Sequence, residues 1–451
     1  MSQVDSGVLR LRFKTKLLFA FALLVYGKSL QASSEPQLDV ISLSATGHDR
    51  LYDIAFTETG SSYAVGSLSD GTAASSDAKV LIVKHRDDGS IDTSFGQGGS
   101  LIFNLIAAGD GEVARSIAVD SKGRIVVAGS VEHAGGADAR DRDLFVLRLT
   151  AAGQIDSSFG TAGVAILNLS EGETVGTGYI SDGFGGMIVD AQDRVLVHGS
   201  AKRPGGLDSD FVMVRLDSEG DFDATFGDTG RATLDIRNLS ASPKAPVLLP
   251  DGDVIGTGYM REGAIVLPVV YKLTSEGRLD TSYGKGGIFS EAVLNSTTEV
   301  YSAVLQGDSL ITVGYGRDNE QESLDVLSLR INPEGKLDTS FGTQGFARID
   351  VDGFNDNGRN IALLPDGRIL LVGGGRFTST NSDGMLAILK SNGELDESFG
   401  DSGVQLFDFG GAQDFLWGAD VAPDLDKVMA VGIKGVQGAT GDDSAIVTLP
   451  L

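Results

Sequence analysis

The chain has no cysteine among its 451 residues, and only four histidines and one tryptophan. Without cysteine there is neither a disulfide framework nor a thiolate metal site, and no two histidines have the spacing of metal ligands. Basic residues are also scarce, with 36 Lys and Arg against 62 Asp and Glu and a net charge of −26. Such a surface repels phosphate backbones and anionic lipid, so we expect no nucleic-acid or membrane-surface partner. No window shows a sustained helical period, so we expect almost no helix.

Glycine, in contrast, is abundant at 62 residues, and much of it belongs to one repeated motif. The motif reads Gly-x-Φ-Asp-x-Ser/Thr-Phe/Tyr-Gly-x-x-Gly, where Φ is Ile, Leu or Phe. Its Asp positions follow one another at intervals of 57 to 67 residues, which predicts a repeat architecture. The motif copies span 89–99, 153–163, 220–230, 277–287, 335–345 and 393–403.

Each repeat contains four short apolar segments bounded by Gly and Asp, which is typical of β-strands. In one repeat these expected strands are 115–119, 124–128, 143–149 and 164–169. Four strands in a repeat of this length predict an all-β fold, a seven-bladed β-propeller of four-stranded antiparallel blades. The first three strands occur seven times and the fourth only six times after the motifs. We therefore expect residues 38–44 to complete the C-terminal blade, in a single domain from 38 to 451.

The motif Asp and aromatic residues have a structural interpretation. An Asp followed by Ser or Thr can bond nearby backbone N–H groups in a turn, and the Φ and aromatic residues can fill the gap between blades. The alternative is a row of calcium ligands. The residues concerned are Asp92, Phe95, Asp156, Phe159, Asp223, Phe226, Asp280, Tyr283, Asp338, Phe341, Asp396 and Phe399.

The segment 335–342, Gly-Lys-Leu-Asp-Thr-Ser-Phe-Gly, together with Leu-Pro-Asp-Gly-Arg-Ile-Leu-Leu-Val-Gly at 364–373, resembles the delta-60 repeat. That repeat is of the propeller type and occurs in exported bacterial proteins. The resemblance covers nearly all of residues 38–451. It implies the fold and an exported location, but no catalytic residues.

The N-terminus has the pattern of a secretory signal peptide. Four basic residues between 10 and 16 precede an apolar run over 17–26, and a polar stretch follows a small-residue region near residue 32. A membrane-spanning helix needs about 20 apolar residues, so a retained anchor is the less favoured interpretation. We expect residues 1–32 to be cleaved, 33–37 to form a short leader, and the product to be a periplasmic or extracellular monomer without membrane insertion.

Catalytic motifs are missing from the sequence. There is no Gly-x-Ser-x-Gly elbow, no phosphate-binding loop before a helix and no EF-hand. Acidic residues near the third strand of two repeats, Asp141, Asp143, Asp208 and Asp210, could bind calcium, or could be solvated or cap turns. We expect no cofactor, with calcium as the alternative.

One row of residues suggests a binding site. Aligning the repeats brings seven residues to equivalent points near the start of the innermost strand: Tyr52, Arg115, Gly185, Lys244, Tyr301, Arg359 and Trp417. Cations and aromatic rings around a concave mouth suit a carbohydrate, an anionic small molecule or a peptide carboxylate. The alternative is that these long side chains merely fill the axis.

Three functions are consistent with these features. The first and favoured one is a non-catalytic recognition or scaffold protein that binds a small molecule, glycan or protein. The second is a polysaccharide hydrolase or lyase with paired carboxylates in the channel, where Asp53, Asp182 and Asp420 are the nearby acids. The third is a structural component of an envelope or surface assembly.

Overall fold

The computed structural model describes residues 36–44, 47–69, 77–106, 111–132, 141–170, 180–202, 208–378, 380–435 and 441–451. The predicted signal peptide lies outside these residues. The described segments are β-strands joined by turns, without a helix, as the sequence predicts. Accordingly, none of them is a helix that could cross a membrane.

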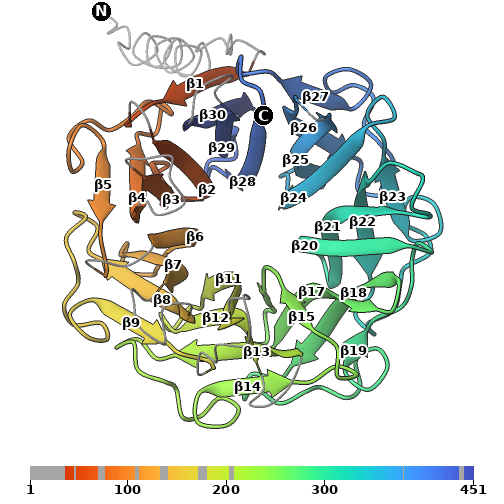
Figure 1. Ribbon diagram of the computed structural model, residues 1–451, viewed down its shortest axis with the longest axis horizontal. Coiled ribbons are helices and arrows are strands. Elements are labelled where there is room, and N and C mark those ends of the chain that lie inside the picture. The colour runs from red at the N-terminus through yellow and green to blue at the C-terminus, as the bar shows by residue number, and fades with distance from the viewer. Residues whose placement is uncertain are drawn as a thin grey trace, which may run out of the picture. The chain divides into compact units, whose positions relative to one another are not determined.

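The strands of the unit Gln37–Leu449 form antiparallel sheets that are arranged around a common axis (Figure 1). The strands nearest this axis are β2 (His48–Phe56), β6 (Gly111–Val119), β11 (Gly183–Val189), β15 (Ala241–Pro243), β16 (Val247–Leu248), β20 (Thr297–Gln306), β24 (Asn355–Leu363) and β28 (Phe415–Val421). The strands paired with them are β3 (Ser62–Ser69), β7 (Ile125–Glu132), β12 (Val195–Lys202), β17 (Val254–Glu262), β21 (Ser309–Arg317), β25 (Ile369–Phe377) and β29 (Lys427–Gly435).

The third position in each set is taken by β4 (Ala78–His85), β8 (Asp141–Leu149), β13 (Ser209–Leu216), β18 (Ile265–Leu273), β22 (Asp325–Ile331), β26 (Asp383–Leu389) and β30 (Asp442–Pro450). Short outer strands follow, namely β5 (Ser100–Phe103), β9 (Val164–Leu167), β14 (Arg231–Leu234), β19 (Ile288–Phe289), β23 (Phe346–Ile349), β27 (Val404–Phe407) and, next to β30, β1 (Gln37–Ile41). A two-residue strand, β10 (Ile180–Ser181), pairs in parallel with β8.

Hydrogen bonding groups these strands into six sheets, four of which have four strands. The largest has nine strands, and a single parallel pair, Val266 with Thr297, joins its two halves. At the ends of the chain, β1 pairs with β30 from Gln37–Thr448 to Ile41–Ser444.

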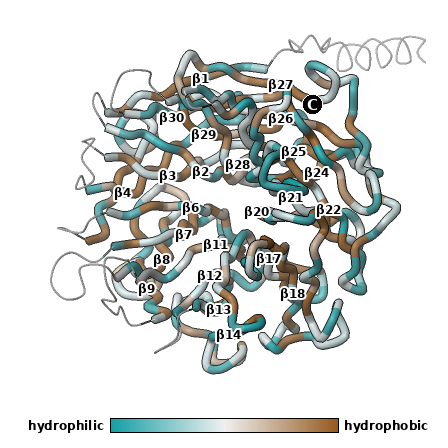
Figure 2. The backbone as a smooth tube through the Cα atoms, turned by 45° about the vertical axis from the view of Figure 1, so that its right-hand side comes forward, coloured by the Kyte–Doolittle hydropathy of each residue, from teal (hydrophilic) through white to brown (hydrophobic). Residues whose placement is uncertain are grey.

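The hydrophobic core lies between neighbouring sets of strands. In Figure 2 the hydrophobic colour follows strands such as β17 and β18, and the joining loops are more hydrophilic. Val126 and Leu144 pack with Val197 and Val212 of the next sheet. Leu51 and Leu81 pack with Met429 and Ile446, so the first and last sheets share a core. Ile255 and Val270 pack with Val300 and Leu327, which places a core between the two halves of the nine-stranded sheet as well.

The motif Asp residues hold turns between sets of strands. Asp156 Oδ1 accepts bonds from the Ser158 hydroxyl and backbone N–H, and its Oδ2 accepts one from Arg148 Nε at 2.9 Å. Arg148 in turn lies over the Phe159 ring and donates to the carbonyl of Ser218 in the next repeat. Every one of the six motif Asp residues has a Lys or Arg within ion-pair distance, from Asp92 to Asp396.

The motif aromatics are buried except for Phe399, which is half-buried. One expectation is wrong for part of the set: the Φ residues Ile155 and Phe222 are 47% and 46% exposed and do not fill a gap between blades. They instead lie over the last glycine of their own motif, where an added Cβ at Gly163 would meet Ile155 at 2.2 Å.

Candidate functional site

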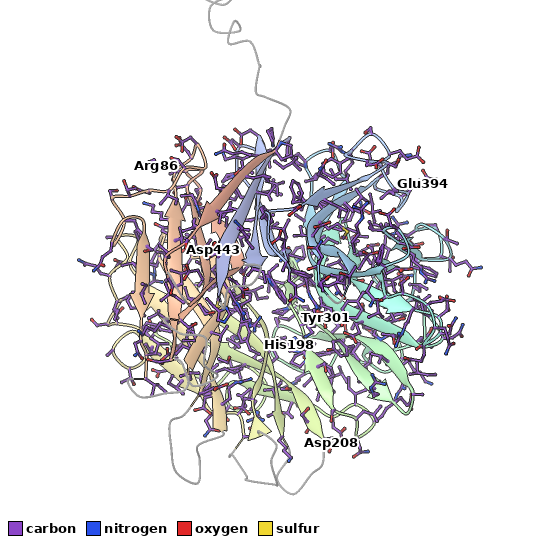
Figure 3. All side chains as sticks on the ribbon, turned by 45° about the horizontal axis from the view of Figure 1, so that its top comes forward. Arg86, His198, Asp208, Tyr301, Glu394 and Asp443 are labelled. Carbon is purple, nitrogen blue, oxygen red and sulfur yellow. The ribbon has the colours of Figure 1, made fainter. Side chains whose placement is uncertain are left out.

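The predicted row of seven residues lines one cavity of about 420 Å³ at the inner strands. Tyr301 lies among the inner strands, whereas Arg86 and Glu394 lie toward the periphery (Figure 3). The cavity also receives residues that the sequence did not single out, among them Ser116, Arg142 and Asn360. Ser116 and Asn360 directly follow a residue of the row, and this adjacency in the sequence could have identified them as cavity residues. Nothing in the sequence connects Arg142 with the row.

A local backbone irregularity explains why these residues face the cavity. In six inner strands the pairing with the next strand skips one residue, and the skipped residue is the member of the row. A β-bulge of this kind leaves the extra residue outside the ladder and re-aims its side chain. The skipped residues are Tyr52, Arg115, Gly185, Tyr301, Arg359 and Trp417.

The seventh member, Lys244, lies in a break of the strand between β15 and β16. Its N–H donates to Thr257 O at 2.8 Å, and its carbonyl accepts a bond from His198 Nδ1 at 2.7 Å. Gly185 makes this arrangement possible, because a Cβ there would meet the backbone of Pro243 and Lys244 at 2.8 Å. A glycine therefore occupies the row where two inner strands approach each other.

His198 is fully buried and supports Lys244 from the neighbouring strand β12. Tyr271 Oη lies 2.8 Å from Nε2, so Tyr271 donates there while Nδ1–H donates to the Lys244 carbonyl. Burial lowers the pKa of His198 to about 4, so the imidazole is neutral at ordinary pH. His198 is thus a positioning residue for the Lys244 backbone.

The three cations of the row lie over aromatic rings. The Arg115 guanidinium is 4.3 Å from the Tyr52 ring centre, and Lys244 Nζ is 4.4 Å from that of Tyr301. Arg359 lies 4.0 Å from the Tyr301 ring centre and 5.3 Å from that of Trp417. Such contacts orient a cation without neutralising it.

Within the described residues, none of these three cations has a carboxylate within ion-pair distance. The Nε and Nη1 of Arg359 and the Nε1 of Trp417 are buried and lack a hydrogen-bond partner there. Burial, reinforced by the neighbouring Arg359, lowers the pKa of Lys244 to about 8. The surrounding protein atoms desolvate the Arg115 guanidinium and lower its pKa as well, even though part of the residue's surface is exposed to solvent.

The acids near the inner strands are engaged by the backbone. Asp53 accepts bonds from the N–H groups of Ile54 and Ile117, both at 3.0 Å. Asp182 accepts one from Leu169 N–H at 2.6 Å and one from the Ser170 hydroxyl. Desolvation raises the pKa of Asp53 to about 7 and that of Asp182 to about 6. Because both oxygens of each acid already accept bonds, neither is a free nucleophile or base.

Asp182 belongs to a recurring set that the sequence reasoning missed. Three residues before a row residue, a buried acid accepts a backbone N–H from the turn that precedes the inner strand. The 57-to-67-residue period could have revealed this position. The acids and their donors are Asp49 with Ser44, Glu112 with Ile106, Asp182 with Leu169, Asp356 with Val351 and Asp414 with Phe409.

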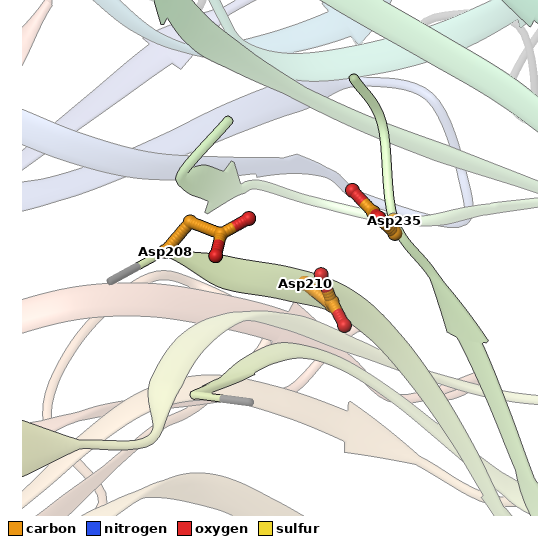
Figure 4. A group of neighbouring side chains, drawn as sticks. All are labelled: Asp208, Asp210 and Asp235. Carbon is orange, nitrogen blue, oxygen red and sulfur yellow. The ribbon is translucent and has the colours of Figure 1, made fainter. Parts of the chain in front are cut away.

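The candidate calcium ligands come from two segments of the chain. Asp141 is the first residue of β8, and Asp143 is buried within that strand. Asp208 directly precedes β13, Asp210 lies on β13, and Asp235 directly follows β14. One oxygen from each of these three residues lies within 4.8 Å of the others (Figure 4). Arg231 interacts electrostatically with Asp210, and its positive charge offsets part of the negative charge of this group of carboxylates.

A larger groove of about 750 Å³ lies along β14 and β18 and is lined by Phe222, Arg231 and Tyr271. Arg231 there donates to the Leu169 carbonyl at 2.9 Å. The groove therefore lacks a convergent group of unpartnered cations, and the inner cavity is the better candidate.

A comparison with models of protein families gives a match to two parts of the chain. A family model described as a domain of unknown function (DUF5122) β-propeller matches residues 123–159 and 364–399. This match supports a β-propeller repeat. A search of curated proteins gives no match.

Solved structures of similar shape are distant in sequence. A Dyadobacter fermentans protein of unknown function is 14% identical with a TM-score of 0.45, covering 92% of this chain and 99% of its own. The β-propeller domain of the Pyrococcus furiosus Trilobed protease is 11% identical with a TM-score of 0.44, covering 90% and 94%. A polysaccharide lyase of family PL25, an ulvan lyase, is 9% identical with a TM-score of 0.45, covering 90% and 95%.

Proposed function

We propose that the chain is a seven-bladed propeller of delta-60-type repeats, in which β1 completes the last blade. Two observations support the count of seven. The nine-stranded sheet is joined by a single parallel pair, and its halves have a hydrophobic core between them, as separate blades do. The pairing of β1 with β30 supplies the outer strand that the C-terminal set of strands otherwise lacks.

We further propose that the protein is an exported, monomeric and non-catalytic recognition module that binds an anionic ligand in the inner cavity. One observation carries this proposal: Arg115, Lys244 and Arg359 converge there without a carboxylate partner in the described residues, in a chain of net charge −26. Desolvating cations without partners destabilises the free protein, and an anion in the cavity would offset that loss. The cavity volume falls within the range of small-molecule sites.

Calorimetric titration of the purified protein with oxyanions tests this function. We expect Arg115→Ala and Arg359→Ala each to weaken binding by about 10-fold or more, since a hydrogen bond to a charged group contributes about 1.5–3 kcal/mol. Arg278→Ala is the matched control, because Arg278 is an exposed cation of the other groove. Equal loss in Arg278→Ala, or unchanged binding in both cavity variants, would contradict a ligand in the inner cavity.

A second candidate is eliminative cleavage of a uronate-containing polysaccharide. The favouring observation is that Lys244 has a pKa of about 8 and lies between Tyr259 and Tyr301, beside Arg359. A neutral Lys244 amine could take the proton next to a sugar carboxylate that Arg359 binds. The C–O bond to the neighbouring sugar then breaks as a conjugated C=C forms, and the leaving oxygen takes up a proton from the Lys244 ammonium or from water. Ultraviolet absorbance of that product, absent in Lys244→Met, is the test.

A flat response in both assays would favour the remaining class, a structural component of an envelope or surface assembly. In that case the protein should be recovered with a partner after crosslinking on intact cells.

A further inference from the structure

The aromatic faces in the inner cavity are already covered by the protein's own cations. Arg115 lies over Tyr52, while Arg359 and Lys244 both lie over Tyr301, which also stacks with Tyr315 at 5.4 Å. A sugar ring binds by placing its apolar face on a free aromatic face. The rings with a cation over them therefore act as supports for the cations.

A comparison within the same chain shows what is unusual about these cations. Arg148, Arg215 and Arg330 each lie over a motif phenylalanine, at 4.5 to 5.0 Å from the ring centre. Each of these arginines is also paired with its motif Asp through Nε, at 2.7 to 2.9 Å. The cavity cations have the ring, but no acid of the described residues is within ion-pair distance of them. The same type of support is thus used without the neutralising carboxylate.

The other charged groups near the cavity are bonded to other partners. Arg142 is paired with Glu132, and Arg50 with Asp442. Asp53 and Asp182 are bonded to backbone N–H groups, and burial raises the pKa of both carboxyls. Glu299 accepts a hydrogen bond from Tyr301 Oη at 2.9 Å and is the acid that faces Lys244. Among the described residues, none of these acids is within ion-pair distance of Arg115, Lys244 or Arg359, so the three cations have no direct carboxylate partner there.

We infer that the ligand is a compact polyanion with at least two negative charges, such as a phosphate ester or a di- or tricarboxylate. This inference rests on the proposed function and narrows it, because neutral glycans and monoanionic peptide termini are the ligands it rejects. Recognition works through the ligand's oxygen atoms: they bond to the three cations and to the unpartnered Arg359 and Trp417 donors. Phosphate and carboxylate oxygens share this chemistry, and bond lengths to guanidinium are similar for both.

Titration with a fixed panel at constant ionic strength tests the inference. The probes are citrate, pyrophosphate and sulfate as polyanions, acetate and glucuronate as monoanions, and maltotriose as the neutral sugar. We expect at least one polyanion to bind at least 10-fold more tightly than acetate, with no binding of maltotriose. Comparison of citrate with pyrophosphate separates the carboxylate source from the phosphate source. Raising the salt concentration should weaken binding of the polyanion more steeply than that of acetate.

Variants link this preference to the cavity. Arg359→Lys keeps the charge and should retain more of the polyanion affinity than Arg359→Ala, whereas Lys336→Ala, an exposed lysine, should leave it unchanged. Near-ultraviolet circular dichroism confirms that each variant is folded.

The outcomes separate the two proposals. If acetate or glucuronate binds as tightly as citrate and pyrophosphate, and Arg359→Ala abolishes that binding, the polyanion inference is wrong and the recognition function stands. If maltotriose binds in preference to every anion, the polyanion inference is likewise overturned. If nothing in the panel binds, both the inference and the anion-binding function fail.

Discussion

Replacing Arg359 by Met should make the free protein more stable while removing its anion binding. The guanidinium of Arg359 and the Lys244 ammonium lie 4.0 Å and 4.4 Å from the centre of the same Tyr301 ring, so the two charges are at most about 8.4 Å apart. At an effective dielectric constant of about 20, their repulsion at that distance is roughly 2 kcal/mol, and in bulk water roughly 0.5 kcal/mol.

Two further effects of the substitution act in opposite directions. Met removes the buried Nε and Nη1 donors that have no partner, and each unsatisfied group costs about 1–3 kcal/mol. It also removes cation–π contacts of about 0.5–2 kcal/mol, although a thioether packs well on aromatic rings. With the smallest donor cost and the largest cation–π loss, the sum predicts a free energy of unfolding higher by about 2 kcal/mol, and a smaller gain at high salt, where the repulsion is screened.

Urea denaturation at low and high salt measures this difference, with Arg148→Met as the matched variant. Arg148 is also a buried arginine over an aromatic ring, but it is paired with Asp156. Breaking that pair should lower the free energy of unfolding by about 3–5 kcal/mol. If Arg359→Met is destabilised as Arg148→Met is, Arg359 has a compensating partner and the argument for an uncompensated cavity fails.

Other predictions concern single buried groups. His85→Leu should raise the free energy of unfolding by about 1–3 kcal/mol in urea denaturation, because both ring nitrogens of this buried histidine lack partners among the described residues. Leu149 or Leu216 occupies the equivalent position in other repeats, and a loss of stability in the variant would contradict the prediction. Affinity for a polyanion should fall as pH rises through about 8, where Lys244 loses its proton, and Lys244→Met should flatten that profile in calorimetry. Burial raises the pKa of Asp356 to about 7, so the contribution of its protonated form to stability is present at pH 4 and is lost as the pH rises through 7. The difference in free energy of unfolding between the wild type and Asp356→Asn should therefore shrink between pH 5 and pH 8. A difference that stays constant would refute the assignment. Chelation with EDTA should leave the melting temperature unchanged, because the positive charge of Arg231 near Asp210 offsets part of the negative charge that would attract a cation. A fall in the melting temperature with EDTA that calcium reverses would instead establish a cation site at Asp208, Asp210 and Asp235.

The sequence by itself was sufficient for the strand order within each repeat and for the members of the cavity row. The row could be found because each of its residues lies 13 to 15 residues before the Gly that ends a β-branched strand, as Arg115 does before Gly129 and Arg359 before Gly373. The bulges that turn these residues toward the cavity were not predictable, because a bulge depends on the partner strand. The exposure of Ile155 and Phe222 was missed for a related reason: hydrophobicity alone does not tell which side of a turn a residue covers.

What the sequence determined, then, is the local and periodic part of this protein: a repeat of short strands, an Asp-centred turn and a row of cations and rings. Only the tertiary structure decided which cations are neutralised. Arg148 meets Asp156 of its own repeat, whereas Arg359 meets Tyr301 and Trp417, which belong to the repeats on either side. Whether a charge is compensated depends on atoms brought within a few ångströms by folding, and sequence spacing across some 60 residues carries no information at that scale.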